Sequence, residues 1–102
     1  LFFNLGPEAA AKSFYLAEQL RAVNIRCELY PEQTRLDKQF RFAEKKNIPF
    51  VIIIGTEELG SGRAKIKNLA TGDQVECSFG ELVSYADRVI RMTDDNSMVR
   101  PL

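Results

Sequence analysis

The pattern of apolar and polar positions predicts a strand, a helix and a second strand at the start of the chain. The apolar run Leu1–Leu5 stops at Gly6-Pro7, which predicts a short buried strand. A helix is then expected to about Asn24, because proline fits a first helical turn and the following apolar residues keep a helical period. Residues 25–30 place apolar side chains on one face and polar ones on the other, which predicts a half-exposed strand.

A second helix is expected over residues 35–46, and it has two distinct faces. Arranged on a helical period, one face carries Leu36, Phe40, Ala43 and Asn47. The opposite face carries the cations Arg35, Lys38, Arg41 and Lys45. Phe42 falls on the basic side, where its ring either packs against a neighbouring loop or offers a stacking platform for an unpaired base.

The run Phe50–Ile54 is wholly apolar, which predicts a central strand covered on both faces. It ends at Gly55, and a loop is expected over residues 56–62. Residues 63–69 and 74–78 then predict a hairpin.

A last helix is expected after Ser78, which has Glu81 at the spacing of a capping box. The elements together predict one three-layer α/β domain over residues 1–92, followed by a polar tail over 93–102. The three strands joined by helices should be parallel, with right-handed crossovers. The hairpin should complete a five-stranded mixed sheet, with three main helices distributed over both faces.

The net charge of the chain is zero, but its charges are unevenly distributed. Residues 35–67 contain eight cations and four anions. A local excess of this size fits either a solvated helix face or a surface of modest affinity for a negatively charged partner.

The residues that several kinds of catalytic and binding site require are absent from the sequence. The chain has no His, so nucleophiles of the Ser-His and Cys-His kinds are excluded. Cys27 and Cys77 stand far apart, and they predict neither a zinc site nor a disulfide framework. Glycine motifs for dinucleotides or nucleotide phosphates do not occur. We therefore expect no catalytic and no metal-binding residue. No apolar run approaches the roughly 20 residues of a membrane span, and no membrane partner is expected.

Glu57 and Glu58 follow the central strand directly. In an open α/β sheet, ligands gather at the carboxyl ends of strands, here between Leu5-Gly6-Pro7 and the two glutamates. A carboxylate suits the Watson–Crick edge of guanine, which RNA loops expose. We therefore expect the basic side of the second helix and this acidic corner to open onto one cleft.

Three segments carry a resemblance to a known family. The first reads GPEA and, after a gap, LAEQLRAVNIRCELY; the others read LDKQFRFAEKKNIPFVIIIGTEEL and KIKNLATGDQ. They resemble the C-terminal anticodon-binding domain of class IIa aminoacyl-tRNA synthetases over about residues 1–92. The KNLATGDQ hairpin is similar to that of the histidine enzymes rather than the threonine, proline or glycine enzymes.

The resemblance implies a sheet of order 2-1-3-4-5 in which strand 4 is antiparallel to the rest. It implies a cytoplasmic, commonly dimeric parent that joins histidine to its tRNA with ATP and magnesium, in a separate catalytic domain of the same chain. This domain alone would hold no cofactor, lack ligase activity and bind the anticodon loop, whose triplet is GUG. The RNA contacts expected here are Arg35, Lys38, Gln39, Arg41, Phe42, Glu57, Glu58, Lys65 and Lys67.

A function of another class remains open from the sequence. The same fold could serve as a protein-interaction or dimerisation module in a non-synthetase protein, through Phe2, Phe42 or the edge formed by residues 25–30. A small nucleotide-binding enzyme is disfavoured by the missing phosphate loop and the missing His.

Overall fold

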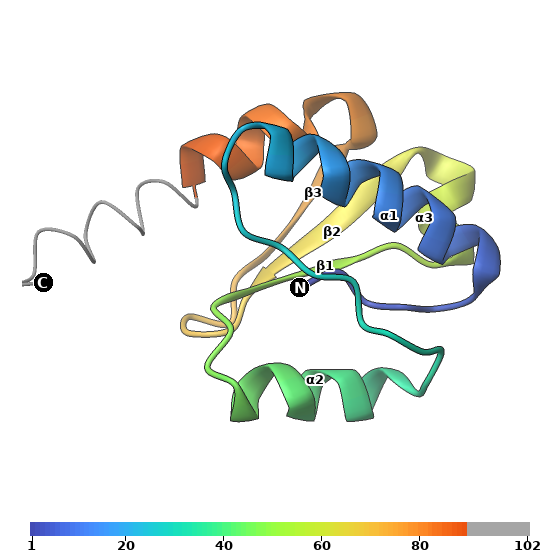
Figure 1. Ribbon diagram of the computed structural model, residues 1–102, viewed down its shortest axis with the longest axis vertical. Helices are drawn as coiled ribbons and strands as arrows, with labels where there is room; N and C mark the ends of the chain where they lie inside the picture. The colour runs from blue at the N-terminus through green and yellow to red at the C-terminus, as the bar shows by residue number, and fades with distance from the viewer. Residues whose placement is uncertain (90–102) are drawn as a thin grey trace, which may run out of the picture.

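A three-stranded antiparallel sheet forms the middle layer of the molecule (Figure 1). The computed structural model describes residues 1–89. In sheet order, the strands are β1 (Phe50–Ile53), β2 (Arg63–Asn68) and β3 (Gln74–Ser78). β2 is antiparallel to both neighbours, so the hairpin expected after the central strand does form beside it.

Helices cover both faces of this sheet (Figure 1). α1 (Pro7–Ala22) and the helical residues 82–89 lie on one face. α2 (Leu36–Lys45) is the single described helix on the other face. α3 (Thr56–Ser61) follows the end of β1, and a short 3-10 turn, η1 (Phe79–Glu81), leads from β3 into residues 82–89.

Two hydrophobic clusters join the layers. The larger one, on the α1 side, includes Phe2, Leu16, Leu20, Ile52, Ile54 and Leu82. The smaller one, on the α2 side, is formed by Phe3, Ala43, Val51 and Ile53. Successive residues from β1 therefore enter opposite clusters, and both are out of water. This explains why Phe50–Ile54 shows no polar alternation.

The predicted five-stranded mixed sheet is wrong, because the two N-terminal extended segments do not form strands. Phe2 makes isolated parallel bridges to Leu29 and to Ile52. The Phe3 N–H donates to the Ile52 carbonyl at 3.0 Å, and the Tyr30 N–H donates to the Phe2 carbonyl at 2.9 Å. The N-terminal segment therefore lies beside β1, but the ladders on both of its sides are too short to count as strands.

Side chains end these ladders by taking over backbone groups. The Asn4 N–H donates to Gln39 Oε1 at 2.7 Å instead of continuing toward β1. The Asn4 side-chain amide in turn donates to the Tyr30 carbonyl at 3.1 Å. On the other segment, the Arg21 guanidinium donates to the Cys27 carbonyl, and Pro31 offers no N–H.

The loop expected over residues 56–62 is also wrong, since most of it is α3. The Glu58 carboxylate accepts the Gly55 N–H at 2.7 Å and so caps the first turn. Gly62 closes the helix in the left-handed conformation, with φ of 73°. The described residues therefore contain four helices, including 82–89, where three main ones were expected.

Residues 90–102 lie outside the described part of the chain. The expected domain boundary after residue 92 and the tail over 93–102 therefore remain predictions. Within residues 1–89, the helices are too short or too polar to cross a membrane.

Candidate nucleic-acid interface

The outward side of α2 presents exposed cations. Arg35 precedes the helix, and Lys38 and Arg41 lie within it; all three are exposed. Asp37 lies 3.5 Å from Arg35 Nε and 3.5 Å from Arg41 Nη2, and these three side chains are at least 61% exposed. Exposed pairs of this kind contribute little to stability, so the arginines can exchange Asp37 for another anion at small cost.

Gln39 lies on the opposite side of α2 and is fully buried. Its Oε1 accepts the Asn4 N–H at 2.7 Å, and its Nε2 donates to the carbonyls of Asn4 at 2.8 Å and Thr34 at 3.0 Å. The side chain therefore fixes α2 against the N-terminal segment. Its inclusion among the RNA contacts remains a prediction, and its contacts here are those of a residue that positions the basic helix.

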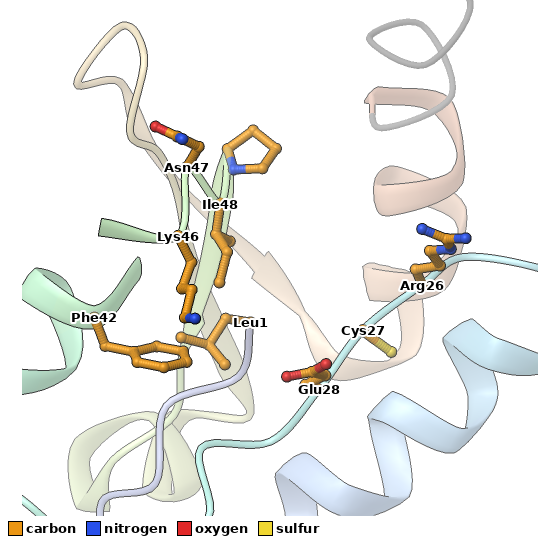
Figure 2. Close-up of a pocket in the computed structure, with 9 residues that line it drawn as sticks. Leu1, Arg26, Cys27, Glu28, Phe42, Lys46, Asn47 and Ile48 are labelled. Atoms are coloured by element: carbon orange, nitrogen blue, oxygen red, sulfur yellow. The ribbon is translucent and has the colours of Figure 1, made fainter. Parts of the chain in front are cut away.

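Phe42 is half-buried, and its ring meets Tyr30 edge to face at a centroid distance of 5.3 Å. It also lines a hollow of about 600 Å³ between the end of α2 and residues 26–28. Figure 2 shows the Phe42 ring beside Leu1, with Glu28 on the opposite wall. Both interpretations of Phe42 thus keep support: the ring packs on a neighbouring segment, and it borders open space.

Leu1 lines the same hollow, and its nitrogen donates to the Phe50 carbonyl at 3.0 Å. The hollow adjoins Ile48 and Pro49, before β1 begins, whereas the two glutamates follow the end of β1. Phe42 and the acidic corner therefore lie toward different ends of this strand.

The two glutamates of α3 have different surroundings. Glu58 is only 8% exposed, and both carboxylate oxygens have partners: Gly55 N at 2.7 Å and Lys65 Nζ at 3.3 Å. Glu57 is exposed in the same turn. Gly55 allows this approach, since a Cβ there would lie 3.1 Å from Glu58 Oε1. Glu57 is thus the more accessible acid, whereas the carboxylate of Glu58 is already occupied by Gly55 N–H and Lys65.

Lys65 and Lys67 lie on the α2 side of the sheet. They stand opposite Ile53 and Val51, which belong to the cluster beneath α2, and cross-strand partners share a face. The Lys67 ammonium lies 5.1 Å from the centre of the Phe40 ring. Phe40 itself packs edge to face on Phe3 at 4.8 Å.

The residues predicted to contact RNA therefore fall into separate groups in the structure. Lys65 pairs with Glu58, and Lys67 covers a ring of α2. Among residues 1–89, no ion pair or hydrogen bond joins Arg35, Lys38 or Arg41 to either glutamate. That the basic side of α2 and the acidic corner open onto one cleft therefore remains a prediction.

Both cysteines carry free thiols, and burial raises the pKa of each. The Cys27 thiol donates to the Ala17 carbonyl at 3.3 Å. No group of three or more His, Cys, Asp or Glu residues within 1–89 is arranged to hold a metal ion. Both thiols behave as small packing residues in this fold.

Residues 3–88 match the sequence model of a family described as the anticodon binding domain. The chain belongs to the anticodon-binding domain family. It is 39% identical over 79 residues to the histidine–tRNA ligase of Flavobacterium johnsoniae, which covers 78% of this chain and 17% of that protein. It is 40% identical over 83 residues to the histidine–tRNA ligase of Bacteroides fragilis, covering 81% of this chain and 18% of that one.

Solved structures agree with this assignment. The anticodon-binding domain superposes on histidyl-tRNA synthetase from Nostoc sp. with a TM-score of 0.80 and 29% identity, covering 87% of this chain and 21% of that one. For the apo enzyme from S. aureus, the TM-score is 0.74 at 27% identity, with coverage of 82% and 22%. The chain spans about a fifth of the length of the proteins it matches.

Sequence reasoning missed two residues that shape this anticodon-binding domain's surface. Asn4 ends the short N-terminal ladder and holds Gln39, and nothing in the apolar run Leu1–Leu5 marks it except that it is polar. Phe40 was assigned only to the apolar face of the second helix, yet its ring is partly exposed beneath Lys67. The sequence contains no signal for this contact, because Phe40 and Lys67 are 27 positions apart.

Proposed function

We propose that this domain recognises the anticodon loop of the histidine tRNA as part of a histidine–tRNA ligase. The relatives named above are histidine–tRNA ligases, and the domain keeps 39% and 40% identity to them. The observation that carries the proposal is the exposed basic side of α2, on the sheet face that no other described helix covers.

Each group of residues has a chemical role in this proposal. Arg35, Lys38 and Arg41 hold phosphates of the loop, because exposed cations attract the backbone of any sequence. Lys65 and Lys67 extend the positive surface along β2.

Two acids supply base selectivity in the same proposal. Glu57 is exposed and accepts from the N1–H and 2-amino group of a guanine in the GUG triplet. Glu58 holds Lys65 through the 3.3 Å ion pair of its Oε2 oxygen, and this oxygen becomes available to the RNA when Lys65 turns to a phosphate.

The catalytic steps belong elsewhere in the parent protein under this proposal. Histidine activation with ATP and magnesium takes place in the catalytic domain of the same polypeptide, in a cytoplasmic, dimeric enzyme. This domain supplies no cofactor site of its own, and alone it does not attach histidine to tRNA.

The test is binding of anticodon stem-loop RNA by the full-length ligase. A labelled hairpin with the GUG triplet competes against hairpins that differ only in that triplet. The proposal expects the GUG hairpin to bind most tightly and the affinity to fall with salt. Equal competition by all hairpins would contradict base recognition, and an affinity independent of salt would contradict the role of α2.

A further inference from the structure

The solvent side of α1 carries an exposed aromatic pair. Phe14 and Tyr15 are 55% and 56% exposed, the highest values among the large hydrophobic residues of the described chain. Ala11, one turn earlier, and Ala22, toward the helix end, are small and also exposed. The small neighbours leave both rings accessible to a surface that approaches α1 from outside.

The opposite side of α1 already packs on the sheet. Leu16, Ala17 and Leu20 are at most 2% exposed and belong to the larger hydrophobic cluster. Apolar side chains thus occur on two sides of one helix. This distribution is typical of a helix that is covered on both sides, rather than of a surface helix with one polar face.

The charges of α1 sum to zero, because Glu8 and Glu18 balance Lys12 and Arg21. The Lys12 ammonium lies 5.6 Å from the Tyr15 ring centre and 5.3 Å from that of Phe79. Arg21 pairs with Glu18 on the same helix. The cations proposed for RNA lie with α2, on the opposite face of the sheet (Figure 1). This neutral, aromatic surface favours a protein partner over a phosphate backbone.

We propose that this outer face of α1, centred on Phe14 and Tyr15, is the surface on which the remaining part of the full-length ligase docks. The inference rests on the proposed function, since it requires that the domain belongs to a longer polypeptide. The matched proteins are about five times as long as the matching part, with 17% to 22% of their length covered. A tethered partner is present at high effective concentration, so a small apolar patch suffices to hold it.

A second copy of this domain is a poorer occupant. Stable interfaces between separate molecules bury about 800 Å² on each partner. Two aromatic rings with small neighbours supply only part of such an area.

The Tyr15 ring can be covered by a partner without leaving its hydroxyl oxygen unpaired, because that oxygen already accepts from Gln19 Nε2 at 3.0 Å.

Hydroxyl-radical footprinting of the full-length ligase without tRNA tests this surface. Val75 is the internal reference, because it is a large hydrophobic residue with 39% exposure on another element. Protection is measured for each residue against the unfolded protein. If the face is covered, the protection of Phe14 and Tyr15 from oxidation should be about fivefold or more greater than that of Val75. In this domain alone both side chains are more exposed than Val75, so the opposite order would be expected without a partner. Protection equal to or below that of Val75 overturns the proposal.

Other occupants give different results. Protection that appears only after tRNA is added assigns the face to RNA and overturns the proposal. Protection that disappears on dilution assigns it to a second copy and does the same. Binding of histidine tRNA by the same sample is a separate readout, so a protected face in a protein without tRNA affinity would refute the proposed function alone.

A matched pair of variants adds an independent measurement. Phe14→Ser combined with Tyr15→Ser should expose residues in the remaining part of the ligase to oxidation, whereas Val75→Ser should not. Both changes concern exposed side chains, and circular dichroism verifies that the fold is kept. Identical footprints for the two variants outside this domain would overturn the proposal.

Discussion

Glu58 and Lys65 form a partly buried ion pair that ties the first turn of α3 to β2. Glu58 Oε2 lies 3.3 Å from Lys65 Nζ, and the two side chains are 10% and 31% exposed. The second carboxylate oxygen accepts the Gly55 N–H at 2.7 Å. One side chain thus ends β1, caps α3 and positions a cation on the sheet face that α2 shares.

Replacing Glu58 should therefore lower stability before any effect on RNA is considered. Glu58→Ala should reduce the free energy of unfolding by about 2–4 kcal/mol, because a buried N–H and an ammonium lose their acceptor. Glu58→Gln keeps an acceptor for Gly55 and should cost about 1 kcal/mol. Urea unfolding measures the free energy of unfolding of both variants. Glu57→Gln, on the exposed neighbour, is the control and should change stability by about 0.5 kcal/mol or less; equal losses at both positions would contradict the assigned roles.

Gln39 should be the most sensitive polar residue of α2. Gln39→Leu keeps a buried side chain of similar size but leaves the Asn4 N–H and two carbonyls without their partner. The expected loss is about 2–4 kcal/mol in urea unfolding. Lys38→Ala, on the exposed side of the same helix, should change stability by about 0.5 kcal/mol or less. A Gln39→Leu variant as stable as the parent chain would show that this clamp is not needed.

Charge reversal on α2 should weaken RNA binding without changing base preference. Lys38→Glu or Arg41→Glu should reduce affinity for any anticodon hairpin by about three- to tenfold, and should make the salt dependence shallower. With about three phosphate contacts, the parent slope of log affinity against log salt should lie near −2. Fluorescence anisotropy at several salt concentrations measures both quantities.

Arg88→Glu is the matched control for these reversals. Arg88 is exposed in the helical residues 82–89, on the sheet face opposite α2. The same change of charge there should leave the slope unaltered. An equal loss at Arg88 would mean that net charge, rather than the α2 surface, governs binding.

The two-sided character of Phe50–Ile54 and the two faces of the second helix could be predicted because each follows from one period of the chain. The sheet of five strands could not, because the outcome depends on side chains far apart in sequence. Asn4 and Gln39 are 35 positions apart, and their bond removes the N–H that a longer ladder would need. A pattern of apolar residues contains no such information.

The candidate site divides in the same way. Exposure of Lys38 and Arg41 follows from helical geometry, so the sequence predicts it correctly. The burial of Glu58 depends on α3, which was expected to be a loop, although Gly55 with a glutamate three residues later fits a helix cap. The short distance between Glu58 and Lys65 is a tertiary contact that spacing alone does not give.

A triplet swap tests whether the full-length ligase recognises the GUG anticodon. The full-length ligase is titrated with two anticodon hairpins that are identical except that both guanines of GUG are replaced by cytosine. We expect the GUG hairpin to bind about tenfold or more tightly than the other. Glu57→Gln, which leaves stability unchanged, should reduce this ratio of affinities. Equal affinity for the two hairpins at every salt concentration would contradict recognition of the triplet.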